Sequence, residues 1–569
     1  MHRLGWLQNM VSHLSLRKAG AGVARARILL LLIAFACVYG VIAGRLIYFG
    51  VAREQSASQK AKAAEAVAQA RPDVVDRNGR LIATDVRTPS LCAEPHRIID
   101  VDEATDLLLK ILPDLDRTEL RSRLSSKRYF AWLRREITPE QQKAIYRLGL
   151  PGIGFLKEYK RVYPNAALAA HVLGQVNVDN QGILGLEKWI DGGGLSALHR
   201  AGFATNHNLA PVEIALDLDV QHAVRDELIA GKERFKAQAA NALVIDVNTG
   251  EIVSMVSLPD FDPNKSSSPK DPSRFNRLMT GVFEMGSTFK ALTTAMALDS
   301  GKVTLESRFD ATQPLKYGKF TIHDFHPQRR MLTVPEVFTY SSNIGSARMA
   351  LALGVDAHKA FLKKMGLLER LRTELPESAM PLIPNPWGEI NTVTIAFGHG
   401  LSVTPLQAVK ATAALVNGGY LIEPTFLRRT EADARKDAPR VVKKSTSDQM
   451  RYLMRLNVEV GSAKRAEVEG YFVGGKTGTS EKVERGRYSK NKLLTAFMGI
   501  FPSDKPKYLV LVMLDEPQKE QGAAAATAGL NAAPVAGKII ARIAPLLGVE
   551  PRTNLPTAQS MLQLRNAAN

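Results

Sequence analysis

The chain has 569 residues, of which 45% are hydrophobic and 23% charged, a composition typical of a folded protein with about two to four domains. Its net charge of +19 is spread along the sequence without a nucleic-acid-binding motif, so nucleic acid is not expected as a partner. The two cysteines, Cys37 and Cys92, are too few for a disulfide framework or for a zinc site built on cysteine pairs.

The first predicted element is a membrane anchor at residues 28–48. Residues 28–44 carry no charge, and a helix over 28–48 spans about 30 Å, the thickness of one bilayer core. Residues 1–27 contain five Lys and Arg residues and no acidic residue, so the positive-inside rule predicts a cytoplasmic tail there. A cleaved signal peptide is the alternative, but its apolar core is usually only about 7 to 15 residues long.

The region after the anchor is expected to begin with a helical spacer at 49–70, which is rich in Ala, Lys, Glu and Gln. Within 71–85, the pair Asn78-Gly79 between two apolar runs indicates a hairpin. Residues 102–150 favour short helices with charged faces. None of these segments contains a catalytic constellation.

The second half of the chain shows a clearer alternation of strands and helices. Residues 212–230 predict a strand followed by an amphipathic helix, and 241–264 predict two strands joined by a turn. Near the end, 507–515 predicts a strand and 532–547 a helix made of small residues. The pattern therefore favours a mixed α+β fold.

Ser287 and Lys290 lie at the start of an apolar, helix-like run. Residues three apart share one helix face, so the two side chains can meet. The serine can attack a carbonyl while free N–H groups stabilise the oxyanion, and the lysine can act as the base if its pKa is lowered. The alternative is an N-cap serine beside a solvated lysine. The same spacing occurs at three other places in the chain, so alone it is a weak signal.

Two further motifs strengthen the enzymatic interpretation. Residues 341–343 read Ser-Ser-Asn in a turn between helical patterns, and residues 476–479 read Lys-Thr-Gly-Thr in a strand-like segment with paired glycines. Glycines in a strand allow a substrate backbone to approach closely. The order S-x-x-K, S-x-N, K-T-G is the signature of penicillin-recognising serine enzymes.

With these motifs the chain resembles the class B penicillin-binding proteins, which are peptidoglycan D,D-transpeptidases, and most closely their FtsI-like division-specific branch. The resemblance runs from the anchor to about residue 547 and includes the segments 76–83, 161–177, 244–264, 398–407 and 497–518. Two positions depart from the family pattern: Met285 replaces a usual proline, and Ser462 replaces a frequent threonine. Neither is expected to touch a catalytic side chain.

The resemblance implies two acyl transfers that need no cofactor and no metal. Ser287 attacks the penultimate D-alanine carbonyl of a stem peptide and expels the terminal D-alanine, with Lys290 as general base. The amine of a second stem peptide then takes the acyl group. The segment around His323, Asp324 and His326 is not expected to bind a metal, because no third ligand follows at zinc-like spacing.

The same resemblance assigns the remaining site residues. Ser341 relays a proton to the leaving amine and is held by the two lysines, and Asn343 hydrogen-bonds the substrate backbone. The N–H groups of Ser287 and Thr479 form the oxyanion hole. The strand that receives the terminal carboxylate consists of Lys476, Thr477, Gly478 and Thr479, a cationic and hydroxyl-rich edge that suits an anion.

The implied architecture is a single transmembrane helix, an elongated non-catalytic pedestal at 71–205, a transpeptidase domain at 206–547 with an antiparallel sheet between helices, and a polar tail at 548–569. The implied location is the inner membrane, with the catalytic domain in the periplasm. The implied partners are peptidoglycan stem peptides, β-lactam antibiotics, an FtsW-type glycan polymerase and other membrane proteins of the division complex.

Rival classes differ mainly in architecture. A serine β-lactamase would be about half as long and unanchored, and a class A penicillin-binding protein would carry a glycosyltransferase domain. A β-lactam sensor would need several membrane spans and an H-E-x-x-H motif, which is absent. Two alternatives stay open: an elongation-type class B transpeptidase, and a division scaffold in which catalysis is secondary.

Overall fold

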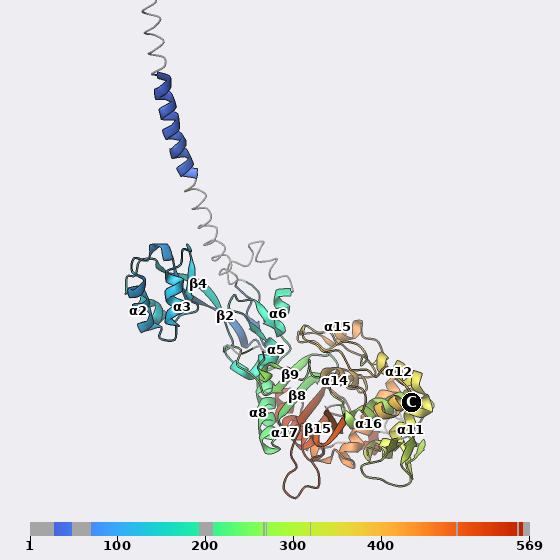
Figure 1. Cartoon of the computed structure of the whole chain (residues 1–569). Coiled ribbons are helices and arrows are strands. Elements are labelled where there is room, and N and C mark those ends of the chain that lie inside the picture. Colours follow the sequence, from blue (N-terminus) through green and yellow to red (C-terminus); the bar gives the residue numbers. More distant parts are fainter. Residues whose placement is uncertain are drawn as a thin grey trace, which may run out of the picture. The chain divides into compact units, whose positions relative to one another are not determined.

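The computed structural model describes residues 28–47, 70–192 and 209–561, apart from positions 266–267, 269, 319, 485–486 and 555–556 (Figure 1). The predicted tail at 1–27, the last residue of the predicted anchor at 28–48, the predicted spacer at 49–70 except Ala70, and the last residues, 562–569, lie outside the described residues. The chain divides into two compact units, a smaller one that contains Arg87–Tyr159 and a larger one that contains Ala70–Val86 and the chain from Lys160 onward.

One helix near the N-terminus, Ile28–Ile47, is long and apolar enough to cross a membrane (Figure 1, dark blue). It has 20 residues and a mean hydropathy of 2.3, and no part of it is buried against the rest of the protein. Within the described parts of the chain it is the one helix with these properties. An apolar helix therefore occurs where the sequence predicts the anchor.

The smaller unit contains short helices, as the sequence predicts for 102–150, and a strand. Each helix begins at a side chain that accepts hydrogen bonds from the first turn: Asp100, Asp116 and Thr138. Apolar residues on the inner faces of the helices form one buried cluster. The elements are α2 (Val101–Ile111), α3 (Arg117–Leu124), β3 (Ala131–Arg134) and α4 (Pro139–Tyr146), and β3 pairs antiparallel with the end of β2 (Leu81–Ala93).

The centre of the larger unit is a five-stranded sheet in which every neighbouring pair is antiparallel. The predicted turn between β8 and β9 is closed by Asp246, whose carboxylate accepts the N–H groups of Asn248 and Thr249. Both strands of 241–264 and the strand of 507–515 are therefore confirmed. The strand order is β14 (Gly474–Glu484), β15 (Arg487–Phe501), β16 (Tyr508–Asp515), β8 (Ala239–Asp246) and β9 (Ile252–Leu258).

The sheet lies between two helical layers because successive side chains of its strands point to opposite faces. In β16, Val510 and Val512 pack in the cluster formed with α8 (Leu218–Arg234) and α17 (Ala532–Leu546). The alternating Leu509 and Leu511 belong to the opposite cluster, which includes α9 (Lys290–Asp299) and α14 (Pro405–Ala414). This arrangement confirms the predicted antiparallel sheet between helices (Figure 1).

The rest of the larger unit consists of short elements. The turn at Asn78 and Gly79 joins β1 to β2, which confirms the predicted hairpin, and Gly79 has a φ of 78°. The strands are β1 (Val74–Val75), β4 (Ile153–Val162, which begins in the smaller unit), β5 (Gln175–Val176), β6 (Gly182–Leu184), β7 (Val212–Glu213), β10 (Arg308–Asp310), β11 (Leu315–Tyr317), β12 (Phe320–Ile322) and β13 (Met331–Thr333). The helices are α5 (Ala170–Leu173), α6 (Gly185–Ile190), α10 (Val334–Thr339), α11 (Asn343–Leu353), α12 (Val355–Lys364), α13 (Glu389–Ile395), α15 (Glu431–Lys436) and α16 (Lys444–Glu459).

A buried ion network joins distant segments of the larger unit. The Arg161 guanidinium lies 2.6 Å from Glu187 and 3.2 Å from Asp85, and all three side chains are fully buried. Arg71 lies 2.9 Å from the same Glu187. Burial alone would raise the pKa of Glu187, but the two guanidinium groups outweigh it and hold that pKa below its ordinary value.

We expect Arg161→Met to lower the free energy of unfolding by about 3–5 kcal/mol, because it leaves buried carboxylates without their main counter-charge. The matched control is Arg234→Met, which breaks a solvent-screened pair with Glu520 and is expected to cost much less. Denaturant unfolding of both variants compares the two losses. Equal losses would contradict a dominant role for the buried network.

Candidate active site

Ser287 and Lys290 lie on one face of a tight helical turn. Ser287 belongs to the 3₁₀ helix η5 (Gly286–Phe289), and Lys290 is the first residue of α9. Side chains three residues apart are eclipsed in a 3₁₀ turn, which places this serine and lysine next to each other. Ser287 is half-buried and caps neither helix, while Lys290 is only 1% exposed. The alternative of a capping serine with a solvated lysine is therefore wrong.

Two lysines converge on the hydroxyl group of Ser341. Lys290 Nζ donates a hydrogen bond to Ser341 Oγ at 3.0 Å and another to the Ser341 carbonyl, and Lys476 Nζ donates to the same Oγ at 3.0 Å. Ser341 lies in the predicted turn, between α10 and α11, with a φ of 56°, a conformation uncommon for a non-glycine residue. The structure thus joins residues from all three motifs.

Burial sets the protonation of both lysines. Loss of water, and then the charge of Lys476, lower the pKa of Lys290 well below its ordinary value, although the carboxylate of Asp324 opposes the shift. Burial also lowers the pKa of Lys476 to about 7. A lysine that is neutral near neutral pH can accept a proton, which is what a serine nucleophile requires.

The Lys-Thr-Gly-Thr segment lies in β14, beside β15, as the sequence predicts. Thr479 Oγ1 accepts the N–H group of Ala528 at 3.1 Å. Thr477 Oγ1 lies 2.6 Å from the hydroxyl of Ser462, one of the two positions that depart from the family pattern. Ser462 therefore contacts a predicted substrate-binding residue, although this residue is not one of the predicted catalytic side chains.

Glycines allow β14 to lie directly against the turn that carries Ser287. A Cβ atom on Gly478 would lie 2.7 Å from the carbonyl oxygen of Met285, and one on Gly286 would lie 2.8 Å from that of Thr479. Gly286 also has a φ of 52°, which favours glycine. The nucleophile and the substrate-binding strand are thus fixed to each other through backbone contacts.

Asp324 holds the Ser-Ser-Asn turn in place. Its carboxylate accepts a hydrogen bond from Ser342 Oγ at 2.7 Å and from the N–H group of Ile344 at 3.0 Å. The Asn343 side chain donates to the carbonyl of His323 at 2.9 Å. From the sequence, this segment is considered only as a metal site. The contact between Asp324 and the turn is not predicted, because the local spacing of residues gives no signal for it.

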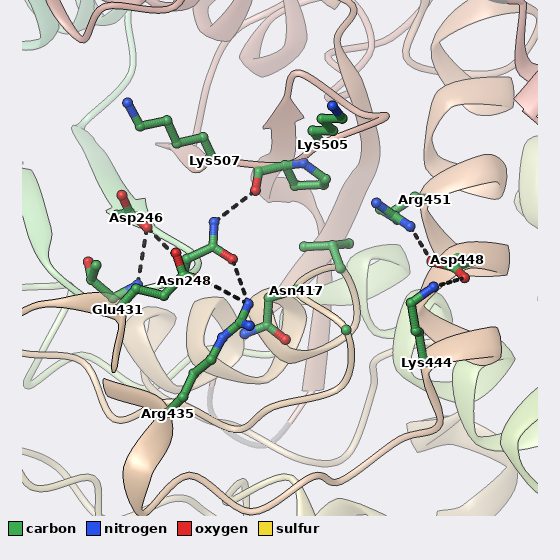
Figure 2. A pocket seen from close by; sticks show the side chains of 14 residues that line it. Asp246, Asn248, Asn417, Glu431, Arg435, Lys444, Asp448, Arg451, Lys505 and Lys507 are labelled. Carbon is green, nitrogen blue, oxygen red and sulfur yellow. Dashed lines mark hydrogen bonds and ion pairs between the residues drawn. The ribbon is translucent and has the colours of Figure 1, made fainter. Parts of the chain in front are cut away.

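The hollow in Figure 2 lies elsewhere on the larger unit. It has a volume of about 500 Å³ and is found where β8 ends and β16 begins. Its lining is mostly charged, and within it Asp448 pairs with Arg451 and, at 3.3 Å, with Lys444. No residue of the three motifs lines this hollow, so it is not the place where the serine and the lysines meet.

Comparisons with known proteins agree with this site. Two half-buried serines that flank a buried lysine, next to a sheet strand that carries Lys-Thr-Gly-Thr, define a serine acyl-transferase of the penicillin-recognising class. The family model "Penicillin binding protein transpeptidase domain" matches residues 240–541, and "Penicillin-binding Protein dimerisation domain" matches residues 66–188. The chain therefore belongs to the penicillin-binding transpeptidase family, as a class B member of the FtsI-like type.

Several curated relatives are similar over most of their length. The probable peptidoglycan D,D-transpeptidase FtsI of Caulobacter vibrioides is 39% identical over 87% of this chain and 84% of its own. The probable peptidoglycan D,D-transpeptidase PenA of Neisseria gonorrhoeae is 32% identical over 94% of this chain and 95% of its own. The peptidoglycan D,D-transpeptidase FtsI of Escherichia coli K12 is 31% identical over 85% of each chain.

We expect Asp324→Asn to slow acylation by penicillin roughly tenfold, because charge-assisted hydrogen bonds to the turn are worth about 1.5–3 kcal/mol. Loss of this carboxylate also lowers the pKa of Lys290 further, so the acid limb of the pH–rate profile should move to lower pH. Stopped-flow acylation across pH measures both effects. Asp356→Asn, which removes an exposed carboxylate of α12, is the control. If acylation slows but the acid limb stays at the same pH, the Asp324 carboxylate does not affect the pKa of Lys290 as we expect.

Proposed function

We propose that this protein is a D,D-transpeptidase that cross-links the stem peptides of peptidoglycan, in septal wall synthesis during cell division. The observation that carries the proposal is the convergence on Ser341 of Lys476 and of Lys290, which lies one helical turn after Ser287. The names of the FtsI relatives support the peptidoglycan substrate and the division role.

In the first step, Ser287 Oγ attacks the penultimate D-alanine carbonyl while its proton passes to neutral Lys290. The tetrahedral intermediate collapses, the terminal D-alanine leaves with a proton, and an ester remains on Ser287. The N–H groups of Ser287 and Thr479 are assigned to the oxyanion. Support comes from the contact between η5 and β14, which brings these two backbone segments together.

Ser341 is assigned the proton transfer to the leaving amine. Its oxygen accepts hydrogen bonds from both lysines, so its own proton is free to be donated. Lys290 can then return a proton to Ser341. Asn343 is assigned to the substrate backbone. The terminal carboxylate is assigned to the strand residues Lys476, Thr477, Gly478 and Thr479.

The domain roles follow from where these residues lie. All the assigned residues fall within 206–547, so this region is proposed as the transpeptidase domain and 71–205 as a non-catalytic pedestal. The helix Ile28–Ile47 supports a single-pass anchor in the inner membrane. Residues 1–27 are assigned to the cytoplasm and residues 49–70 to a spacer. The enzyme, including the tail at 548–569, is assigned to the periplasm. β-Lactams are expected inhibitors, and an FtsW-type polymerase and other division proteins are proposed partners.

A penicillin should acylate Ser287 and no other serine, because Ser287 alone among the described serines combines a helix start with a buried partner lysine. Labelling with a fluorescent penicillin, followed by peptide mapping, locates the adduct. Ser287→Ala should abolish the label, and an adduct on Ser341 would contradict the assignment. Imaging of the labelled protein in dividing cells separates a septal role from an elongation role, in which the label would follow the side wall.

Lys476→Ala should slow acylation by penicillin at least roughly tenfold, since one charge-assisted hydrogen bond to the ligand carboxylate is lost. An ester-capped penicillin lacks that carboxylate and should be affected much less. Acylation rates of both ligands with both proteins form the comparison. If the two ligands slow equally, Lys476 serves to position Ser341 and does not bind the carboxylate.

A further inference from the structure

Glu284 is an incompletely paired carboxyl group three residues before Ser287. Its Oε1 atom accepts hydrogen bonds from the N–H group of Gly400 at 2.8 Å and from the Tyr488 hydroxyl at 3.1 Å. Its Oε2 atom is buried and has no hydrogen-bond partner among the described residues, and no cation there forms an ion pair with it. A carboxylate in this state is costly, because it has lost water without gaining a counter-charge.

The backbone of Glu284 lies against β14, directly after the Lys-Thr-Gly-Thr segment. Its carbonyl accepts a hydrogen bond from Ser480 Oγ at 2.7 Å, next to Thr479 on β14. The loop that carries Gly400 is held against the turn of the nucleophile, because Gly286 N–H donates to the Gly398 carbonyl at 3.2 Å. The backbone of Glu284 is therefore fixed to the substrate-binding strand, and its carboxyl group is held by the loop 398–400 and by Tyr488 of β15.

His399 lies near both Tyr488, which hydrogen-bonds Glu284, and Lys290. Its ring packs against that of Tyr488, with the centroids 5.6 Å apart. Burial, and then the nearby charge of Lys290, lower the pKa of His399 to about 4, so the ring is neutral and supplies no cation to Glu284. Neither Glu284 nor His399 has a task in the acylation step described above.

Holding the loop at Gly400 accounts for Oε1 of Glu284 but leaves Oε2 without a partner in the part of the chain that the structure describes. Glu187, a structural buried carboxylate of the same unit, is bound by two arginines. Glu284 has only neutral donors, and they occupy one of its two oxygens. Burial accordingly raises its pKa. Glu284 therefore has room for a further charged partner at one of its two oxygens, and the described residues supply no such cation.

The reaction brings one such cation to the site. The donor stem peptide presents a carboxylate, which the lysines receive, whereas the acceptor presents a primary amine that is an ammonium ion in water. We propose that the incompletely paired carboxylate of Glu284 binds the ammonium group of the acceptor stem peptide and thereby selects an amine over water. This inference rests on the transpeptidase function proposed above.

The protons balance in the transfer step. The ammonium gives one proton to ionised Glu284, which leaves a neutral amine and a neutral carboxylic acid. The amine nitrogen then bonds to the acyl carbon, the bond from that carbon to Ser287 Oγ breaks, and the second proton of the nitrogen passes through Lys290 to Ser287 Oγ. Glu284 finally releases its proton to solvent. Water brings no positive charge and therefore gains no ion pair with the same carboxylate.

The test compares two acceptors for one acyl-enzyme. The full-length protein is acylated with a D-alanyl thioester and offered D-alanine, a zwitterion whose amino group is an ammonium ion, together with methanol, which carries no charge. The ratio of amide to methyl ester is measured for the wild type, for Glu284→Gln and for Glu481→Gln. Glu481 is a neighbouring β14 carboxylate with solvent access, so its variant changes the net charge equally.

We expect Glu284→Gln to lower the amide-to-ester ratio roughly tenfold, with acylation by penicillin within about twofold of the wild type. Glu481→Gln should change neither. Both products come from the same acyl-enzyme, so the ratio does not depend on how much of a variant folds. Glu284→Asp keeps the carboxylate and should give a ratio closer to the wild type than to Glu284→Gln.

Three results would overturn the proposal: an unchanged ratio in Glu284→Gln, an equal fall in Glu481→Gln, or a ratio in Glu284→Asp no better than in Glu284→Gln. A loss of penicillin acylation as large as the loss of amide would also overturn it, since Glu284 would then serve to position Ser287. If the wild type is not acylated at Ser287, the proposed transpeptidase function is overturned together with the role of Glu284. If the wild type is acylated and only the product ratio fails to change, the role of Glu284 alone is overturned.

Discussion

Two lysine side chains that are almost fully removed from water share one hydroxyl group, and the site depends on this contact. Lys290 and Lys476 cannot both carry a full charge there at low cost, because burial and mutual repulsion both disfavour the ammonium form. The sheet and its two helical layers keep water out, and this exclusion makes a lysine, ordinarily protonated, available as a base. Stability of the core and reactivity of the serine therefore have the same physical origin.

Charge is distributed in the site according to what each substrate brings. The strand that is proposed to receive the donor carboxylate holds a lysine whose pKa is about 7, so an arriving anion favours its protonated form. Glu284, three residues before the nucleophile, is an acid whose pKa is raised by burial. Burial disfavours the charged form of both groups in the free enzyme, and a ligand of opposite charge would favour that form.

The sequence predicts the main strands, the two-sided sheet and the three motifs, because these depend on local periodicity and short spacing. It does not predict Asp324 beside Ser342, Ser462 beside Thr477 or Glu284 beside Gly400. Those pairs are separated by 18, 15 and 116 residues, so only the folded chain brings them together. The buried arginine network was likewise invisible, since charged residues are ordinarily expected at the surface.

The close backbone contacts at Gly286, Gly398 and Gly478 limit how this enzyme can evolve under antibiotic selection. A Cβ atom on Gly398 would lie 1.9 Å from the Gly286 carbonyl oxygen, so any side chain there displaces the nucleophile for peptide and drug alike. Resistance that preserves cross-linking must therefore arise at side chains around this rigid frame. Ser462, which touches Thr477 without fixing the backbone, is the kind of position where a small change can alter drug recognition and still leave wall synthesis intact.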